Sequence, residues 1–190
     1  ATLAPAGDLD QDGTPDFLAA ALGSSAQGPW TGQVYRISGK TQAVLGWETG
    51  DVADAWFGQA LAGGVDMNKD GVPEYLVGSP REDINGIPQA GGVRMYNGKT
   101  NQLWFTWWGG AMDQNMGRSV GLAGDWNGDS WQDVILGSPG ASNLEGVKSG
   151  YVRIAKGNTG GALATFYGQT EGELFGYQAC VIDWDGDAIL

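Results

Sequence analysis

Short apolar and alternating runs recur along the chain and predict β-strands. Residues 17–22 (FLAAAL) and 134–138 (VILGS) are almost wholly apolar, whereas residues 33–37 (QVYRI) alternate apolar and polar side chains. Turn residues such as NGKT and DG separate these runs. No segment keeps a helical period over three turns. The pattern therefore predicts an all-β chain.

The same pattern returns along the chain at a nearly constant interval. Four acidic stretches begin at Asp8, Asp66, Asp125 and Asp183, which are almost equally spaced. Three other markers keep the spacing: a Phe-Gly or Met-Gly pair, a Gly-Ser-Pro motif, and a glycine in a later turn. A period of this length, ~59 residues, indicates a repeat architecture.

Four short strands in each repeat of about 60 residues are typical of a β-propeller blade. We therefore predict blades of four antiparallel strands, about three complete and one partial, in a single array over residues 1–190. The predicted units are 1–58, 59–117, 118–175 and the partial 176–190. Three blades cannot close a ring, and open sheet edges invite pairing. The array is thus expected to be an incomplete ring or a segment of a polymer joined head to tail.

The acidic stretches have the ligand spacing of a cation loop. Oxygen side chains at positions 1, 3, 5 and 9, with the backbone carbonyl of position 7, form an all-oxygen set that favours calcium. The predicted ligands are Asp8, Asp10, Asp12, Thr14 and Asp16; Asp66, Asn68, Asp70, Val72 and Glu74; Asp125, Asn127, Asp129, Trp131 and Asp133; and Asp183, Asp185 and Asp187. The fourth set stops at Leu190, before its position 9.

Two other interpretations of these loops agree less well with the sequence. An EF-hand requires a glutamate at position 12 and flanking helices, but position 12 is Ala19, Val77 or Leu136 within apolar runs. A solvated Asp- and Gly-rich turn explains one loop, but not four in phase. Glycine stands at position 6 in the first two loops and at position 4 in the others. We therefore expect their turns to relax differently.

Residues 57–80 (FGQALAGGVDMNKDGVPEYLVGSP) and 116–139 (MGRSVGLAGDWNGDSWQDVILGSP) resemble the FG-GAP repeat of integrin α-subunit propellers and bacterial surface proteins. The resemblance covers the whole chain. It implies four-stranded blades, Ca²⁺ in the acidic loops, and an extracellular or cell-surface role in binding a protein or glycan ligand. Met116 in place of Phe and Glu74 in place of Asp depart from the usual motif.

Composition excludes several functions. The net charge of −12 argues against nucleic acid, whose binding requires a basic face. The absence of histidine excludes Ser-His and Cys-His catalysis, so the chain is predicted not to be an enzyme. No apolar run is long enough for a membrane span. The GKT triplets lack the preceding Walker glycine and are interpreted as hairpin turns.

Tryptophans and the single cysteine each allow two interpretations. Tryptophan can anchor a partner or fill the space between blades, and packing is favoured for any single one. Cys180 lies in an apolar run and is expected to be a buried small residue.

Three functions follow. The first is a non-catalytic, calcium-stabilised extracellular binding or adhesion scaffold. The second is a structural subunit of an extracellular filament built by self-association. The third is a non-catalytic domain of a larger secreted enzyme. The ligand cannot be read from the sequence.

Overall fold

The computed structural model describes residues 2–180, which contain twelve β-strands and no helix. The fourth acidic stretch, with Asp183, Asp185 and Asp187, lies outside the described residues. The strands are β1 (Leu3–Gly7), β2 (Asp16–Ala21), β3 (Gln33–Ile37), β4 (Val44–Thr49), β5 (Ala60–Val65), β6 (Glu74–Ser79), β7 (Gly92–Tyr96), β8 (Leu103–Trp108), β9 (Ser119–Gly124), β10 (Asp133–Ser138), β11 (Tyr151–Ala155) and β12 (Ala162–Tyr167).

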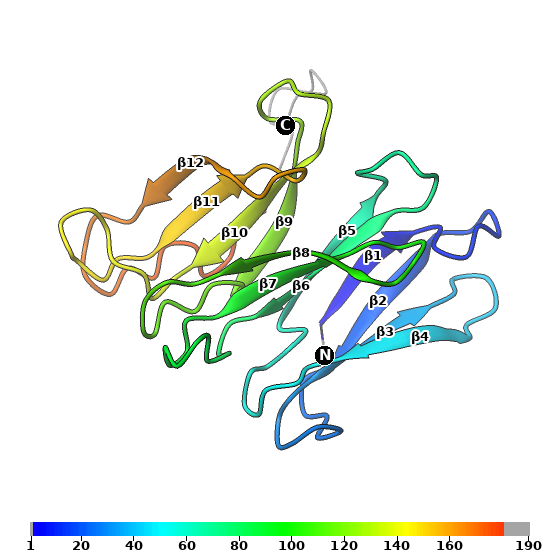
Figure 1. Cartoon of the computed structure of the whole chain (residues 1–190), viewed down its shortest axis with the longest axis horizontal. Helices are drawn as coiled ribbons and strands as arrows, with labels where there is room; N and C mark the ends of the chain where they lie inside the picture. Colours follow the sequence, from blue (N-terminus) through cyan, green and yellow to red (C-terminus); the bar gives the residue numbers. More distant parts are fainter. Residues whose placement is uncertain (1, 181–190) are drawn as a thin grey trace.

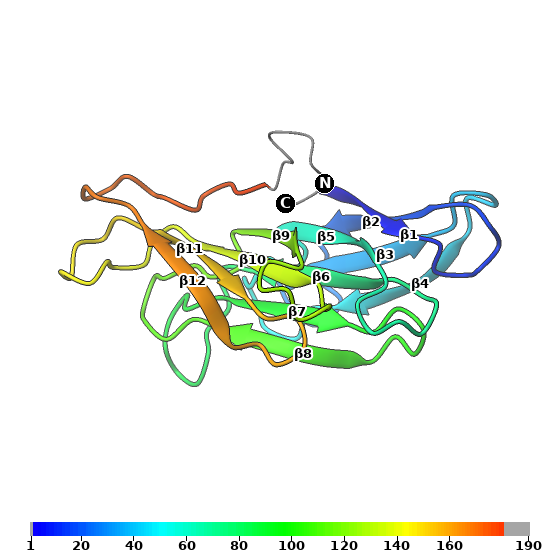
Figure 2. The same ribbon diagram turned by 90° about the horizontal axis from the view of Figure 1, so that it is seen from above.

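The strands form three four-stranded antiparallel sheets, and in each sheet the spatial order follows the chain. The sheets lie side by side in Figure 1, and their first strands, β1, β5 and β9, are neighbours. Figure 2 shows the same arrangement from above. This confirms the predicted all-β fold with propeller-type blades. No closed ring is formed by the described residues.

Each sheet packs a face against the next one, as its alternating side chains require. Leu18 and Val34 of the first sheet meet Tyr75 and Val77 of the second in one buried cluster. Leu76 and Met95, on the other face of the second sheet, meet the third sheet in a second cluster. The unit bounds predicted from the sequence stay a prediction, although each sheet lies within one of those ranges.

The Phe-Gly pair joins one sheet to the next. Phe57 and Met116 are both 1% exposed, so methionine fills the same place as phenylalanine. The amide of Gly58 donates to the carbonyl of Gly78, and that of Gly117 to Gly137, each at 3.0 Å. Gly117 has φ +85°, and an added Cβ would collide with the carbonyl oxygen of Gly92. These glycines therefore allow the backbone of one connection to lie directly on the next sheet.

The tryptophans divide between packing and exposure. Trp107 is buried and donates to the carbonyl of Gly160 at 3.0 Å, while Trp104 packs near Trp131. These two fill the space between the second and third sheets. Trp30, Trp47 and Trp126 are instead at least half exposed.

Cys180 corrects a prediction from the sequence. The apolar run predicts a buried thiol, but Cys180 is exposed, because residues 177–180 do not join a sheet. A helix that could cross a membrane is not found among the described residues.

Candidate metal centres

The acidic loops connect the first and second strands of each sheet, all at the same end of the blades. In every sheet a β-bulge precedes the loop, at Ala6, Gly64 and Ala123, where the first strand skips one residue in its pairing with the second. A bulge increases the local twist and redirects the chain. These equivalent bulges therefore bring the chain into each loop in the same way.

One set of hydrogen bonds recurs in all three described loops. In the second loop, the amides of Asp70 and Gly71 donate to the two carboxylate oxygens of Asp66 at 3.1 and 2.9 Å. The amide of Val72 donates to Asp70, and that of Met67 donates to Glu74 at 2.7 Å. The first loop repeats these bonds around Asp8, Asp12 and Asp16, and the third around Asp125, Asp129 and Asp133. The carboxylates at positions 1, 5 and 9 thus build the loop itself.

The backbone conformation also repeats in the three described loops. The sequence predicted instead that the turn of the third loop would relax differently from the first two. Position 4 has positive φ in each loop, at Gln11, Lys69 and Gly128 (58°, 63° and 74°). Position 6 does so as well, at Gly13, Gly71 and Ser130 (86°, 92° and 69°). The third loop therefore keeps the same turn but holds a serine in a left-handed conformation that favours glycine.

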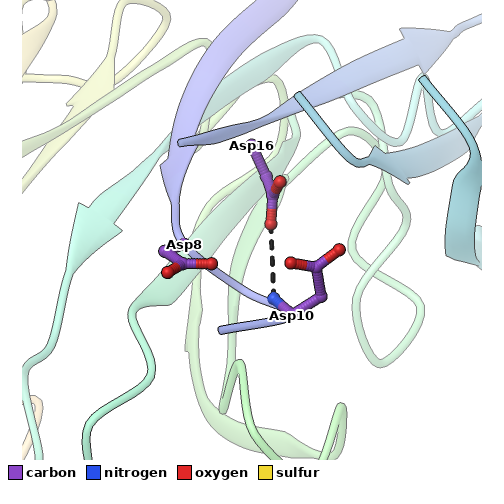
Figure 3. A group of neighbouring side chains, drawn as sticks. All are labelled: Asp8, Asp10 and Asp16. Carbon is purple, nitrogen blue, oxygen red and sulfur yellow. Dashed lines mark hydrogen bonds between the residues drawn. The ribbon is translucent and has the colours of Figure 1, made fainter. Parts of the chain in front are cut away.

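Three carboxylates converge in the first two loops. Oxygens of Asp8, Asp10 and Asp16 all lie within 4.8 Å of one another, as do oxygens of Asp66, Asp70 and Glu74. Figure 3 shows the first group, in which the amide of Asp10 donates to Asp16 at 3.4 Å. Within residues 2–180 the third loop has no such trio.

Side-chain length and identity explain this difference. The first loop has an aspartate at position 3, Asp10, and the second has the longer glutamate at position 9, Glu74. The third has neither, because position 3 is Asn127 and position 9 is Asp133. Asn127 donates its side-chain amide to Asp133 at 3.0 Å, just as Asn68 donates to Glu74 at 2.8 Å in the second loop.

The carboxylate at position 9 is buried in every loop. Asp16 is 3% exposed, Glu74 1% and Asp133 0%. Burial, helped by the neighbouring charges of Asp70 and Asp66, raises the pKa of Glu74 to about 7 despite the hydrogen bonds from Met67 and Asn68, which lower it. Burial likewise raises the pKa of Asp133. A positive charge nearby would stabilise the ionised form of these buried carboxylates.

The pKa of Asp70, nearer the loop surface, is shifted in the opposite direction. Its slight burial raises the pKa of the carboxyl, but hydrogen bonds from Val72, Asn97 and Asn68 and the charge of Lys99 outweigh this and lower the pKa. Asp70 is therefore ionised beside a carboxyl that is held partly neutral.

The turn between the third and fourth strands supports the acidic loop. The ammonium groups of Lys40 and Lys99, from the two GKT triplets, donate to the backbone carbonyls of Asp12 and Asp70, each at 3.0 Å. The amide of Asn97 reaches Asp70 at 3.3 Å. The sequence identified GKT only as a turn. The nearly constant separation along the chain between each triplet and its acidic loop, 28 residues for Lys40 and Asp12 and 29 for Lys99 and Asp70, is the signal that could have shown this contact.

The donor set fits a hard cation. Every side-chain ligand group is an oxygen donor, and each trio brings three carboxylates close together. The remaining predicted ligands of these loops, Asp12, Thr14, Asn68 and Val72, lie in the same turns but outside the two trios. Metal binding by all the predicted ligands of the first two loops, and by Asp125, Asn127, Asp129, Trp131 and Asp133 of the third, stays a prediction.

No family model matches the chain. It is 29% identical to integrin alpha-4 of Xenopus laevis over 82% of its length, which covers 15% of that protein. It is also 29% identical to the phosphatidylinositol-glycan-specific phospholipase D of Homo sapiens over 96% of its length, covering 25% of the relative. Integrin alpha-2 of Bos taurus is 32% identical over 57% of the chain. The chain thus spans a quarter or less of these relatives.

The similarity to several integrin α-subunits agrees with the repeat motif, the four-stranded sheets and the acidic loops at one end of each sheet. These similarities support an FG-GAP-like family of repeat proteins for this chain.

Proposed function

We propose that the chain is a non-catalytic, calcium-stabilised scaffold for extracellular binding or adhesion. The observation that carries this proposal is the convergence of three carboxylates in each of the first two acidic loops. The similarity to integrin alpha subunits supports the binding role. A protein or glycan ligand and a location at the cell surface follow from the same likeness.

Calcium would be held by the oxygens of Asp8, Asp10 and Asp16 in the first loop and by those of Asp66, Asp70 and Glu74 in the second. When bound, the ion supplies positive charge that offsets the repulsion among these carboxylates. Unit charges at close range repel by roughly 4 kcal/mol at an effective dielectric constant near 20. The chain's own residues then fix the loop through the backbone hydrogen bonds to positions 1, 5 and 9.

Loop order is coupled to the contact between blades by the residue at position 2. Leu9 is buried in the core between the first and second sheets, and Met67 in the core between the second and third. Leu9 lies beside Gly98 and Met67 beside Gly157, each a turn of the following unit. A loop that opens would withdraw this side chain from its neighbour. Calcium in the loop therefore supports the packing of one blade on the next.

Chelation of calcium tests this proposal. Each site that is occupied at a hundredfold excess over its dissociation constant adds about 2.7 kcal/mol to folding. Removing calcium from two sites should lower the free energy of unfolding by about 5 kcal/mol. Calorimetric titration of the whole chain with Ca²⁺ should show two sites that Asp8→Asn with Asp66→Asn removes. A melting temperature unchanged by chelation would contradict the proposal.

Two alternatives keep specific support. The third sheet has an exposed face: Phe166 is 48% exposed, whereas its counterpart Trp107 in the second sheet is 7% exposed. A filament by self-association would cover such a face, and the mass of the purified particle tests it.

The similarity to the phospholipase D supports the third possibility, a non-catalytic domain of a larger secreted enzyme. Purified chain without hydrolase activity is the outcome expected for all three.

A further inference from the structure

A pocket of about 200 Å³ lies at the end of the blades opposite the acidic loops. Its walls come from the loops between β6 and β7 and between β10 and β11, and from the connections that leave β4, β8 and β12. The acidic loops and the lysine-bearing turns join the strands at the other end. The lining includes Trp56, Arg81, Asn115, Arg118, Leu174 and Tyr177, but none of the predicted loop ligands. The pocket therefore uses no predicted metal ligand.

Two arginines in this pocket have no carboxylate partner among the described residues. Arg81 and Arg118 form no ion pair within 4.0 Å and no side-chain hydrogen bond there, although the chain has 22 acidic residues. Arg94 and Arg36, in contrast, are paired with Glu82 and Glu48. No acidic residue lines the pocket. A protein of net charge −12 thus has a local site where positive charge is uncompensated.

Both guanidinium groups are held by aromatic rings. The guanidinium carbon of Arg81 lies 4.5 Å from the ring centre of Trp56, and that of Arg118 lies 3.9 Å from the ring centre of Tyr177. Stacking orients the planar guanidinium and leaves the N–H donors at its edge available. That edge matches a carboxylate, which accepts two parallel hydrogen bonds.

The repeat does not account for these arginines. Arg81 occupies the position of Gly140 in the following unit, and Arg118 occupies that of Gln59 in the preceding one. The fold therefore accepts an uncharged residue at both places. Trp56, Asn115 and Leu174, at equivalent positions of the three units, all have positive φ (57°, 55° and 57°) and all line the pocket. The chain thus departs from the repeat at the two arginines, which converge on one pocket with the bulky Trp56 and Leu174.

Size and composition indicate the class of ligand. The pocket is smaller than typical sites for whole small molecules, which begin at roughly 300 Å³. Arginine, tryptophan and tyrosine are the residues that contribute most to protein–protein interfaces. The ring faces covered by the guanidiniums cannot also stack on a sugar. These observations favour one acidic side chain of a protein partner.

We propose that this pocket binds an aspartate or glutamate side chain of an acidic peptide segment, with the carboxylate between Arg81 and Arg118. This inference rests on the proposed binding function and names its partner class. The apolar surfaces of Trp56, Leu174 and Tyr177 receive the neighbouring methylene groups.

Binding of a capped peptide to the whole chain tests the proposal. The probe is a labelled peptide, Gly-Leu-Glu-Glu-Leu-Gly with blocked ends, and its matched control has glutamine in place of glutamate. Fluorescence anisotropy in saturating calcium should show binding of the glutamate peptide at least about tenfold tighter than that of the glutamine peptide. Arg81→Gln and Arg118→Gln should each weaken it about tenfold, since each removes a charged hydrogen-bond donor. Lys148→Gln, which removes one exposed positive charge that does not line the pocket, should leave affinity unchanged.

Equal affinity for the two peptides, or unchanged affinity in the doubly substituted chain, would overturn the proposal. A sulfated disaccharide that binds more tightly than the glutamate peptide, through the same arginines, would also overturn the assignment to a protein partner. Melting temperatures with and without calcium separate this test from the proposed function. If the unsubstituted chain does not bind the glutamate peptide but its melting temperature still rises with calcium, only the pocket proposal is rejected. If calcium does not change the melting temperature of the unsubstituted chain, the calcium scaffold is rejected.

Discussion

The second and third acidic loops share the backbone turn and one set of hydrogen bonds to positions 1, 5 and 9, yet only the second gathers three carboxylates. Both hold their position-9 carboxylate buried, at 1% exposed for Glu74 and 0% for Asp133. Both place asparagine at position 3, at Asn68 and Asn127. The second loop compensates with a glutamate one methylene longer, which reaches Asp66 and Asp70.

This comparison separates the fold of the loop from its capacity to bind a metal. The backbone turn is made by hydrogen bonds that the carboxylates accept, so it forms wherever positions 1, 5 and 9 are acidic. A cation site additionally needs side chains that converge on one point. The third loop satisfies the first condition and not the second, and so we expect calcium to bind it more weakly.

The largest effect should come from removing the position-5 carboxylate. Asp70→Ala should lower the free energy of unfolding in saturating calcium by about 2.7 kcal/mol, the contribution of one occupied site. Asp129→Ala should cost less than half as much, since its loop has no trio. Urea unfolding of both variants measures this difference. Among the described residues Asp113 pairs only with Lys148, at 3.9 Å, and it has φ 58°, so Asp113→Asn is the control and should cost least.

The pH dependence without metal should be dominated by Glu74. Its folded-state pKa, about 7, is above the ordinary glutamate value of 4.5. The folded state therefore holds the proton more tightly than the unfolded state, and this stability is fully present below about 4.5 and is lost as pH rises through about 7. In chelator, the urea concentration at the unfolding midpoint should fall as pH rises from about 4.5 to about 7. Glu74→Gln should flatten this dependence of the midpoint on pH more than Asp133→Asn does. A profile unchanged by Glu74→Gln would contradict the assignment.

The missing trio of the third loop should be restored by one substitution. Asn127→Asp gives this loop the position-3 carboxylate that Asp10 supplies in the first loop. Calcium affinity of the third site should rise by about tenfold or more, because one further charged ligand is added. Calorimetry should detect an additional site. Asn127→Gln, which adds length without charge, is the control and should leave the number of sites unchanged.

The smallest effect should come from the turn itself. Ser130 has φ 69°, a conformation that costs residues other than glycine about 1 kcal/mol or more. Ser130→Gly should stabilise the chain by about 0.5–1 kcal/mol after the entropy of the unfolded glycine is subtracted. Gly71→Ser should destabilise it by a similar amount. Thermal unfolding in chelator measures both, and two shifts of the same sign would refute this account of the turn.

The repeat made much of the architecture predictable from the sequence. Strand runs, turns and acidic loops are local patterns. Because they recur at a nearly constant interval, each prediction applies to all three units. Position 9 of the loop could be identified because Asp16, Glu74 and Asp133 stand at the same offset. Met116 could be aligned with Phe57 for the same reason.

Other features depend on contacts between distant residues. The burial of Trp107 and the exposure of Trp47 could not be told apart from sequence, because each depends on whether another sheet covers the face. The exposed Cys180 was predicted wrongly, because an apolar run does not by itself join a sheet. The contacts of Lys40 and Lys99 with the acidic loops connect two hairpins that only folding brings together.

The sequence by itself determined the repeat, the strands and the acidic ligand positions, because these depend on neighbouring residues and on a constant spacing. The tertiary structure decided which carboxylates converge, since a single methylene or a change from aspartate to asparagine decides whether an oxygen reaches its neighbours. It also brought Arg81 and Arg118 to one pocket at the opposite end of the blades. Those arginines belong to different repeats, and only the packing of the second sheet on the third makes them neighbours.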